Sequence, residues 1–356
     1  MPRSSSYLQR VLPMLLPVWA ALGANPPSTD IQLAIQANDT WSPDRGPAGD
    51  RANLGYLKDI GQFRLTEATL ILSSEWRHIG FRVDGGAGDF YKMDMAGDSW
   101  KGPNQYVSQA FLILKPDVGV PIRLELGKFF SSVGAEVPQS YLDFNTTRSL
   151  LFWYGSPAYH AGVRATSPVT RRLTVGVQLL SGCNTITGMH GHQTIALTAS
   201  WTAKHWSVSE IYMGGNEKPV GRGWRQLSDS VFNISPSPKA TAYFEFLGAE
   251  ERRITPGYDR WFGWASAWRF SPWKNWSISP RMEWYDDQTG FSTGYAQRLS
   301  AFTLTGEYRP VKFVVARLEY RNQWSNLTVS LPGQNSALYP KQTMIAGLTF
   351  LFEHRM

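Results

Sequence analysis

Cysteine and long apolar runs are the scarcest features of this 356-residue sequence. It contains one cysteine, Cys183, so no intramolecular disulfide can form, and the chain is not a small secreted domain held together by disulfides. Beyond residue 24 no run of 18 apolar residues occurs. Because a helix needs about 20 apolar residues to cross a bilayer, a helical membrane protein is excluded.

The first 24 residues differ in character from the rest. Arg3 and Arg10 precede an apolar stretch, 11–22, and small residues follow it. This order is that of a secretory signal peptide, and the stretch is too short to span a membrane. We therefore expect residues 1–24 to be a cleaved signal peptide and the protein to be exported. Residues 25–356 show no linker-like change in composition, which predicts a single domain.

Aromatic residues are abundant although the mean hydropathy of the chain is negative. The 15 Trp, 15 Tyr and 18 Phe make an unusual composition for a soluble domain. A transmembrane β-barrel explains it, because one face of each strand meets lipid while Trp and Tyr gather at both membrane interfaces. The formal net charge is +7, or +5 without the two arginines of the signal. This excess suits an anionic membrane surface or anionic solutes and specifies neither.

Residues 276–285 show the strand pattern best. Apolar and polar side chains alternate there with a period of two, whereas a helix would place Ser279, Pro280 and Glu283 on its apolar stripe. The same alternation, with one polar face, recurs at 194–201, 302–309 and 312–321. These segments therefore predict β-strands with two chemically different faces.

Short turns and long loops alternate along the chain. We expect seven short turns, rich in proline or basic residues, at 74–76, 115–117, 167–169, 203–205, 235–238, 271–273 and 309–311. We expect eight longer loops at roughly 39–60, 86–104, 130–158, 182–191, 215–225, 250–259, 287–297 and 324–340. Short turns on one rim and long loops on the other are typical of transmembrane barrels. The chain is therefore predicted to be all-β, a transmembrane antiparallel β-barrel of about 16 strands, with 14 to 18 allowed because the first and tenth strands alternate poorly.

Five short segments carry a more specific pattern. They are Gln109–Leu112, Leu124–Phe129, Gly134–Glu136, Ser149–Phe152 and Tyr159–Arg164. Together they resemble the OmpL-like family of β-barrel porins over about residues 60–180. The resemblance implies passive diffusion of small hydrophilic solutes or ions through the outer membrane. Outer-membrane barrels commonly end on an aromatic residue, so we take Phe352 as that residue and Glu353–Met356 as an extension beyond it.

The longest loop, 130–158, is third in order and is the candidate constriction. In general porins the third loop folds into the lumen. Here it carries an apolar cluster, Leu150–Tyr154, which an exposed loop would have no reason to carry and which could pack on the inner wall. Its own charged residues are Glu136, Asp143 and Arg148.

Charged residues on the inward faces of the strands complete the candidate site. The flanking strands contribute Arg123, Glu125 and Arg164, and later strands contribute Arg281, Glu283, Arg317, Glu319 and Arg321. Further inward charges are expected at Arg82, Asp84, Glu307 and Arg309. We predict a pore-lining constriction of mixed sign. In the alternative interpretation these charges pair along the wall and stabilise neighbouring strands by about 0.2–1 kcal/mol without selecting any solute.

Two other classes of protein stay open at this point. A secreted soluble β-sandwich that binds carbohydrate or adheres to surfaces could share the alternation, although it would not explain the rhythm of turns and loops. An outer-membrane barrel hydrolase would need a nucleophile, a base and an orienting group. His78, His160 and His205 are the histidines in strands or turns, and none has an evident nucleophile and acid in matching register. We expect no enzymatic activity and no catalytic residues.

A metal site and cofactors are not expected either. Met189–His192 offers two imidazoles near Cys183, but the segment is glycine-rich and has no acidic partner in register, so we interpret the histidines as ordinary loop residues. The expected location is the cell outer membrane. The expected partners are outer-membrane lipid and lipopolysaccharide, the barrel-assembly machinery and small hydrophilic solutes, with a homotrimer as one option and no nucleic acid. Phosphate-like anions, sugars and unselective diffusion all remain open as solutes.

Overall fold

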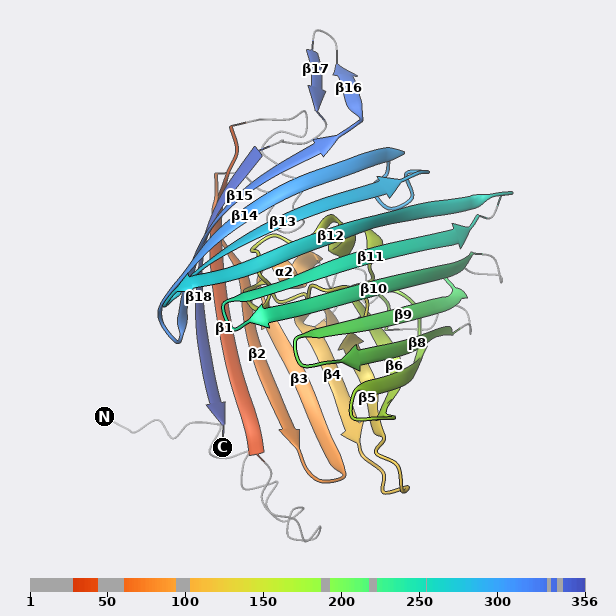
Figure 1. Cartoon of the computed structure of the whole chain (residues 1–356). Coiled ribbons are helices and arrows are strands. Elements are labelled where there is room, and N and C mark those ends of the chain that lie inside the picture. Colours follow the sequence, from red (N-terminus) through yellow and green to blue (C-terminus); the bar gives the residue numbers. More distant parts are fainter. Residues whose placement is uncertain are drawn as a thin grey trace.

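A computed structural model describes residues 28–43, 61–93, 103–186, 193–217, 223–253, 255–331, 334–337 and 342–355, which form a closed β-barrel (Figure 1). Strands β1 to β15 pair in sequence order, and β18 closes the barrel by pairing with β15 on one side and β1 on the other. All of these pairings are antiparallel. The predicted all-β barrel of 16 strands is therefore confirmed.

The strands of the barrel are β1 Ser28–Trp41, β2 Phe63–Glu75, β3 Ile79–Ala87, β4 Val107–Leu114, β5 Arg123–Phe130, β6 Tyr159–Pro168, β7 Leu173–Leu180, β8 Thr194–Thr202, β9 Trp206–Asn216, β10 Trp224–Ser237, β11 Ala240–Arg252, β12 Tyr258–Trp273, β13 Trp276–Asp287, β14 Gln297–Val311, β15 Val314–Ser325 and β18 Gln342–Arg355. β16 Thr328–Leu331 and β17 Gln334–Ala337 form a separate hairpin, which projects from the barrel in Figure 1. The short helical segments are α2 Asp89–Met93, η2 Pro103–Tyr106, η3 Ser140–Leu142 and η4 Leu151–Gly155. Among the described residues, no helix has the length and apolarity needed to cross a membrane.

Each strand presents one face outward and one into the barrel. In β13, Ser279 and Arg281 are buried, whereas Ile278 and Met282 are exposed on the outside. A soluble protein would bury the apolar face, so an exposed apolar face on a closed barrel is what lipid contact requires. The alternation predicted from residues 276–285 therefore has its polar side inside.

The barrel wall is not uniform around its circumference. Strands β3 to β9 have 8–11 residues, while β10 to β15 and β18 have 12–16. Exposed aromatic side chains follow the long strands, and β12 alone exposes Tyr258, Phe262, Trp264, Phe270 and Trp273. The large hydrophobic side chains exposed on β4 to β7 are all aliphatic: Leu112, Val163, Val175, Val177 and Leu179. The aromatic belt expected of a barrel in a membrane thus lies mainly on the longer strands, β10 to β15 and β18.

The predicted short turns at 235–238, 271–273 and 309–311 are displaced in the structure. The strands continue through Pro236, Pro272 and Pro310, and the chain reverses a few residues later, at 238–239, 274–275 and 312–313. The hydrogen-bonded register shifts at each of these prolines. Proline has no N–H to give to the ladder, so it is tolerated at an irregularity near a strand end and does not have to mark the turn itself.

The C-terminal prediction was also wrong in part. Residues 353–355 are not an extension, because β18 continues through them and pairs Asp30 with Arg355 and Ile31 with His354. Phe352 faces outward and is exposed, while Glu353 lines the interior. The alternation of faces simply continues to the end of the strand.

Two other predictions concern residues outside the described part of the chain. These are the signal peptide, 1–24, and the histidines at 190 and 192. Within the described ranges, no group of three or more His, Cys, Asp or Glu side chains could hold a metal ion.

Candidate functional site: the third loop and the lumen

The segment between β5 and β6, residues 131–158, lies inside the barrel (yellow in Figure 1). We call it the third loop. It contains η3 and η4 and has little regular structure, so most of its backbone N–H groups need partners outside a helix or sheet. The inner wall of the barrel provides many of them.

Four carboxylates of the wall accept hydrogen bonds from the backbone of the third loop. Asp229 of β10 accepts from Gly134 N at 2.8 Å, and Glu245 of β11 accepts from Ala135 N at 3.1 Å. Farther along the loop, Glu319 of β15 accepts from Thr146 N at 2.6 Å and Thr147 N at 3.0 Å, and Glu283 of β13 accepts from Leu150 N at 2.5 Å. Each of these hydrogen bonds gives a backbone N–H of the loop a partner on the wall, so the four carboxyl groups fix the path of the loop across the lumen.

Arginines of the same wall bind the loop as well. Arg281 is fully buried and donates to Glu136 at 2.7 Å, to Thr147 O at 2.6 Å and to Glu283 at 2.9 Å. Arg317 donates to Ser140 O and Asp143 O, both at 2.8 Å.

Further ion pairs complete this network. Arg321 reaches Glu283 at 2.6 Å, and within the loop Arg148 lies 3.2 Å from Asp143. Each of the four buried arginines, Arg148, Arg281, Arg317 and Arg321, thus has a carboxylate partner.

The apolar cluster predicted in the loop packs against the inner wall. Leu150 and Leu151 are buried, and a Cβ added to Gly155 would come within 3.0 Å of Leu247 of β11. Tyr285 of β13 donates its hydroxyl to Tyr154 O at 2.9 Å, and the two rings lie 5.8 Å apart. A side chain at position 155 would therefore require Leu247 to move, and glycine allows the closest contact between loop and wall.

The remaining predicted charges lie on the other side of the barrel, on β5 and β6. Arg123 donates to Glu125 at 2.9 Å and to Glu75 at 2.8 Å, and Arg164 also pairs with Glu125. Arg123, Glu125 and Arg164 border a cavity of about 340 Å³. The rest of its lining includes Thr166, polar inward side chains of β7 to β9, Ser132 of the third loop and Asp229 of β10. The side chains of Arg123 and Arg164 are 34% and 20% exposed, so both can meet a solute.

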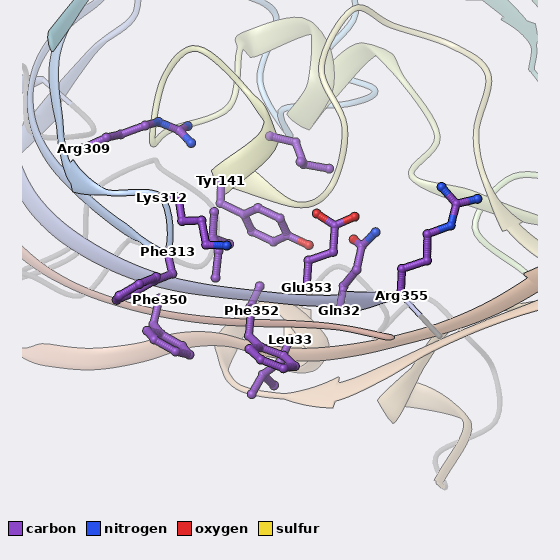
Figure 2. Close-up of a pocket in the computed structure, with 13 residues that line it drawn as sticks. Gln32, Leu33, Tyr141, Arg309, Lys312, Phe313, Phe350, Phe352, Glu353 and Arg355 are labelled. Atoms are coloured by element: carbon purple, nitrogen blue, oxygen red, sulfur yellow. The ribbon is translucent and has the colours of Figure 1, made fainter. Parts of the chain in front are cut away.

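A larger cavity of about 950 Å³ lies where β1 and β18 meet the turn between β14 and β15. Figure 2 shows Tyr141 of the third loop above it, with Arg309, Lys312, Glu353 and Arg355 on the same side of the wall. The rings of Phe313, Phe350 and Phe352 lie on the opposite side. The polar side of this cavity is therefore the lumen.

The predicted site residues thus form two separate groups. The structure gathers eight of them into a buried network between loop and wall: Glu136, Asp143, Arg148, Arg281, Glu283, Arg317, Glu319 and Arg321. Arg123, Glu125 and Arg164 form the other group, beside the cavity of about 340 Å³. Sequence reasoning missed Asp229 because the weak alternation of the tenth strand hid which of its residues face inward. It also missed Glu245 of β11, although the neighbouring Phe246, exposed outward, marks Glu245 as facing the lumen.

His160 has a serine partner that the sequence did not reveal. Its Nε2 lies 3.1 Å from Ser131 Oγ, and its Nδ1 lies 2.8 Å from Gly182 O. His160 is 1% exposed, and its second nitrogen faces a carbonyl where a carboxylate would orient a catalytic histidine. The pair therefore contributes to packing below the fourth loop and gives no support to a hydrolase.

A closed barrel of 16 antiparallel strands, apolar outside and polar inside, with a loop folded into its lumen, defines the class of outer-membrane porins. The family model described as "Putative beta-barrel porin-2, OmpL-like" matches residues 32–352, and the chain belongs to this family. The resemblance seen in the sequence is confirmed. The protein is a porin.

Solved structures agree with this assignment at the level of the fold. An anion-selective porin from Comamonas acidovorans is 11% identical, with a TM-score of 0.65 over 93% of this chain and 100% of that one. OmpT of Vibrio cholerae in its trimer form is 13% identical, with a TM-score of 0.63 over 92% and 100%. The outer-membrane channel DcaP of Acinetobacter baumannii is 11% identical, with a TM-score of 0.62 over 91% and 97%. No curated protein matches the sequence.

Proposed function

We propose that small hydrophilic solutes diffuse passively through this porin between the third loop and the inner wall of β5 to β9. One observation carries the proposal. The third loop is anchored by buried charges on β10 to β15, while the polar cavity beside Arg123 and Arg164 stays open next to β7, β8 and β9. A loop held mainly by one wall, with fewer contacts elsewhere such as Gln178 to Ser132 at 3.1 Å, narrows the lumen and leaves this cavity beside it. The third loop is then the constriction of the pore.

The eight buried charges have a positioning role in this account, and Arg123 and Arg164 are the ones that a passing solute meets. A solute cannot touch side chains that are covered on every side, such as Arg281 at 0% exposure. Of the charged residues expected at the constriction, the eight buried ones therefore hold the third loop in place, and Arg123 and Arg164 face the solute.

Single-channel recording in planar bilayers tests the proposal. The refolded chain should give stable conductance steps in potassium chloride, and its unboiled form should migrate faster on SDS gels than the boiled form. A folded, inserted barrel that passes no current would contradict diffusion past the third loop.

We also infer the features of the mature protein that follow from this role. Residues 1–24 are removed on export, the barrel-assembly machinery inserts the chain among lipid and lipopolysaccharide, and the barrel carries out no chemistry of its own. A homotrimer fits the outward face of β4 to β7, because lipid-facing aromatic anchors are missing from its described residues and another subunit could cover it. Mass spectrometry of the intact protein in detergent would give the mass of three chains if this is right and of one chain if it is wrong.

A further inference from the structure

We propose that the lumen selects small anions that carry carboxylate or phosphate groups. This inference rests on the proposed diffusion of solutes through the lumen and names their chemical class. The observation behind it is that positive and negative side chains differ in exposure to the lumen. Around the cavities below the third loop the guanidinium groups are exposed, while most of the carboxylates that pair with them lie beneath.

The first arginine cluster surrounds one carboxylate. Glu307 of β14 accepts from Arg309 at 2.7 Å and from Arg317 at 2.8 Å, and it also pairs with Arg269 of β12. The Glu307 side chain is 3% exposed, whereas those of Arg309 and Arg269 are 36% and 21% exposed. Arginine keeps its charge at every physiological pH, so three cations on one carboxylate leave an excess of two positive charges, and the exposed part of the cluster is cationic.

The second cluster lies on the other side of the barrel. Lys115 and Arg123 share Glu75, and Arg123 and Arg164 share Glu125. Three cations thus meet two carboxylates. Glu210 and Asp229 also border this cavity, but Asp229 is 2% exposed and accepts from Gly134 N, and Glu210 lies on the outward face of β9 with Val208 and Tyr212, bonded to Ser228 and Ser230. Glu75 is as exposed as its partners, but Glu125, which lies deeper along β5, is 10% exposed while Arg164 is 20% exposed.

The cavity in Figure 2 is also lined by more positive than negative side chains. Arg309, Lys312 and Arg355 face it together with Glu353, and Arg355 also lies 3.4 Å from Asp30. Arg309 thus links the first cluster to this cavity.

The two clusters attract an anion from opposite sides. In strand order β5 and β6 are about half the circumference away from β12 to β15, so a solute in the lumen passes between them. Walls of low dielectric concentrate this field along the pore. An exposed guanidinium group can also form two parallel hydrogen bonds to a carboxylate or phosphate, whereas chloride, a single atom, cannot accept a bidentate pair in this way. We therefore expect anion preference in general and retention of organic anions in particular.

Reversal potentials across a gradient of potassium chloride, and then of potassium succinate, test this inference. The wild-type channel should favour the anion in both salts by several-fold. Arg269→Gln combined with Arg309→Gln should lower the ratio of anion to potassium permeability toward one, and so should Arg123→Gln combined with Arg164→Gln. Arg298→Gln is the matched control, because Arg298 pairs with Asp286 on the other face of β13 and β14.

Each outcome has a distinct meaning. Faster migration of the unboiled band shows that a variant has folded. Lys312→Gln, in the turn between β14 and β15, is a further variant that should also lower the ratio of anion to potassium permeability. A conducting wild-type channel that prefers potassium would overturn the inference alone, as would folded double variants that keep the wild-type ratio. An inserted barrel without conductance would overturn the proposed function itself.

Discussion

Arg281 shows how the anchoring of the third loop depends on single side chains. It reaches Glu136, Glu283 and the backbone at Thr147, and it has no contact with solvent. Arg281→Ala would leave two buried carboxylates with one cation fewer, which costs about 3–5 kcal/mol. We expect the folded band of this variant on unboiled SDS gels to be lost at a lower temperature than in the wild type.

Arg298→Ala is the control for this effect. Arg298 is 65% exposed in its pair with Asp286, and an exposed pair contributes at most about 1 kcal/mol. Equal thermal shifts in the two variants would show that the loop does not depend on the buried network.

Cys183 provides a second test at the scale of one residue. It lies in the fourth loop, packs against the apolar cluster of the lumen and donates its backbone N–H to Glu217 at 3.0 Å. Burial raises the pKa of its thiol to about 12, and the nearby Glu217 carboxylate adds to the shift. Because the thiolate is the reactive form, maleimide should label the folded protein very slowly at pH 7 to 8 and label it readily after denaturation. Rapid labelling of the folded barrel would contradict this placement of Cys183.

Charged residues also show what the sequence could and could not predict. Alternation placed Arg281, Glu283 and Arg317 correctly on the inward face, since a strand has only two faces. It could not show that Glu136 is the partner of Arg281, 145 positions away, because that contact depends on where the third loop crosses the lumen.

At the scale of the strand, β18 carries the closure of the barrel. Its last residues, 353–355, pair with Asp30, Ile31 and Gln32 of β1. Deletion of residues 353–356 would leave the backbone groups at the start of β1 without their β18 partners and so open the seam that closes the barrel. We expect a much smaller folded fraction, measured by the mobility shift on unboiled gels.

The β16–β17 hairpin supplies the control for this deletion. It pairs only with itself in the described structure, so shortening it should leave the folded fraction unchanged. If the C-terminal deletion folds as well as the shortened hairpin, the last residues of β18 are dispensable for closure of the barrel.

Strands were predicted better than turns. The count of 16 followed from the rhythm of turns and loops, which does not depend on the limits of any one strand. Turn positions failed at Pro236, Pro272 and Pro310, because proline was read as the point of reversal when each proline occupies an irregular position inside a strand end. A local pattern cannot separate these two cases.

The whole molecule combines a barrel wall, a loop that crosses the interior and is bound mainly to β10 to β15, and a polar cavity beside β5 to β9. Sequence periodicity predicted the wall, and the length and apolar cluster of the third loop predicted its inward fold. The side of the lumen left open was not predictable, because it follows from contacts between residues more than 90 positions apart, such as Gly134 with Asp229.

The central claim is that solutes pass between the third loop and the wall of β5 to β9, and a cysteine placed on that wall tests it most directly. Thr198 of β8 lines the cavity, while the neighbouring Leu197 is 56% exposed on the outside. In a Cys183→Ser background, a charged thiol reagent added to the Thr198→Cys channel should reduce its single-channel conductance, and the same reagent should leave the Leu197→Cys channel unchanged. Unaltered conductance in a Thr198→Cys channel that mass spectrometry shows to be fully modified would contradict this path.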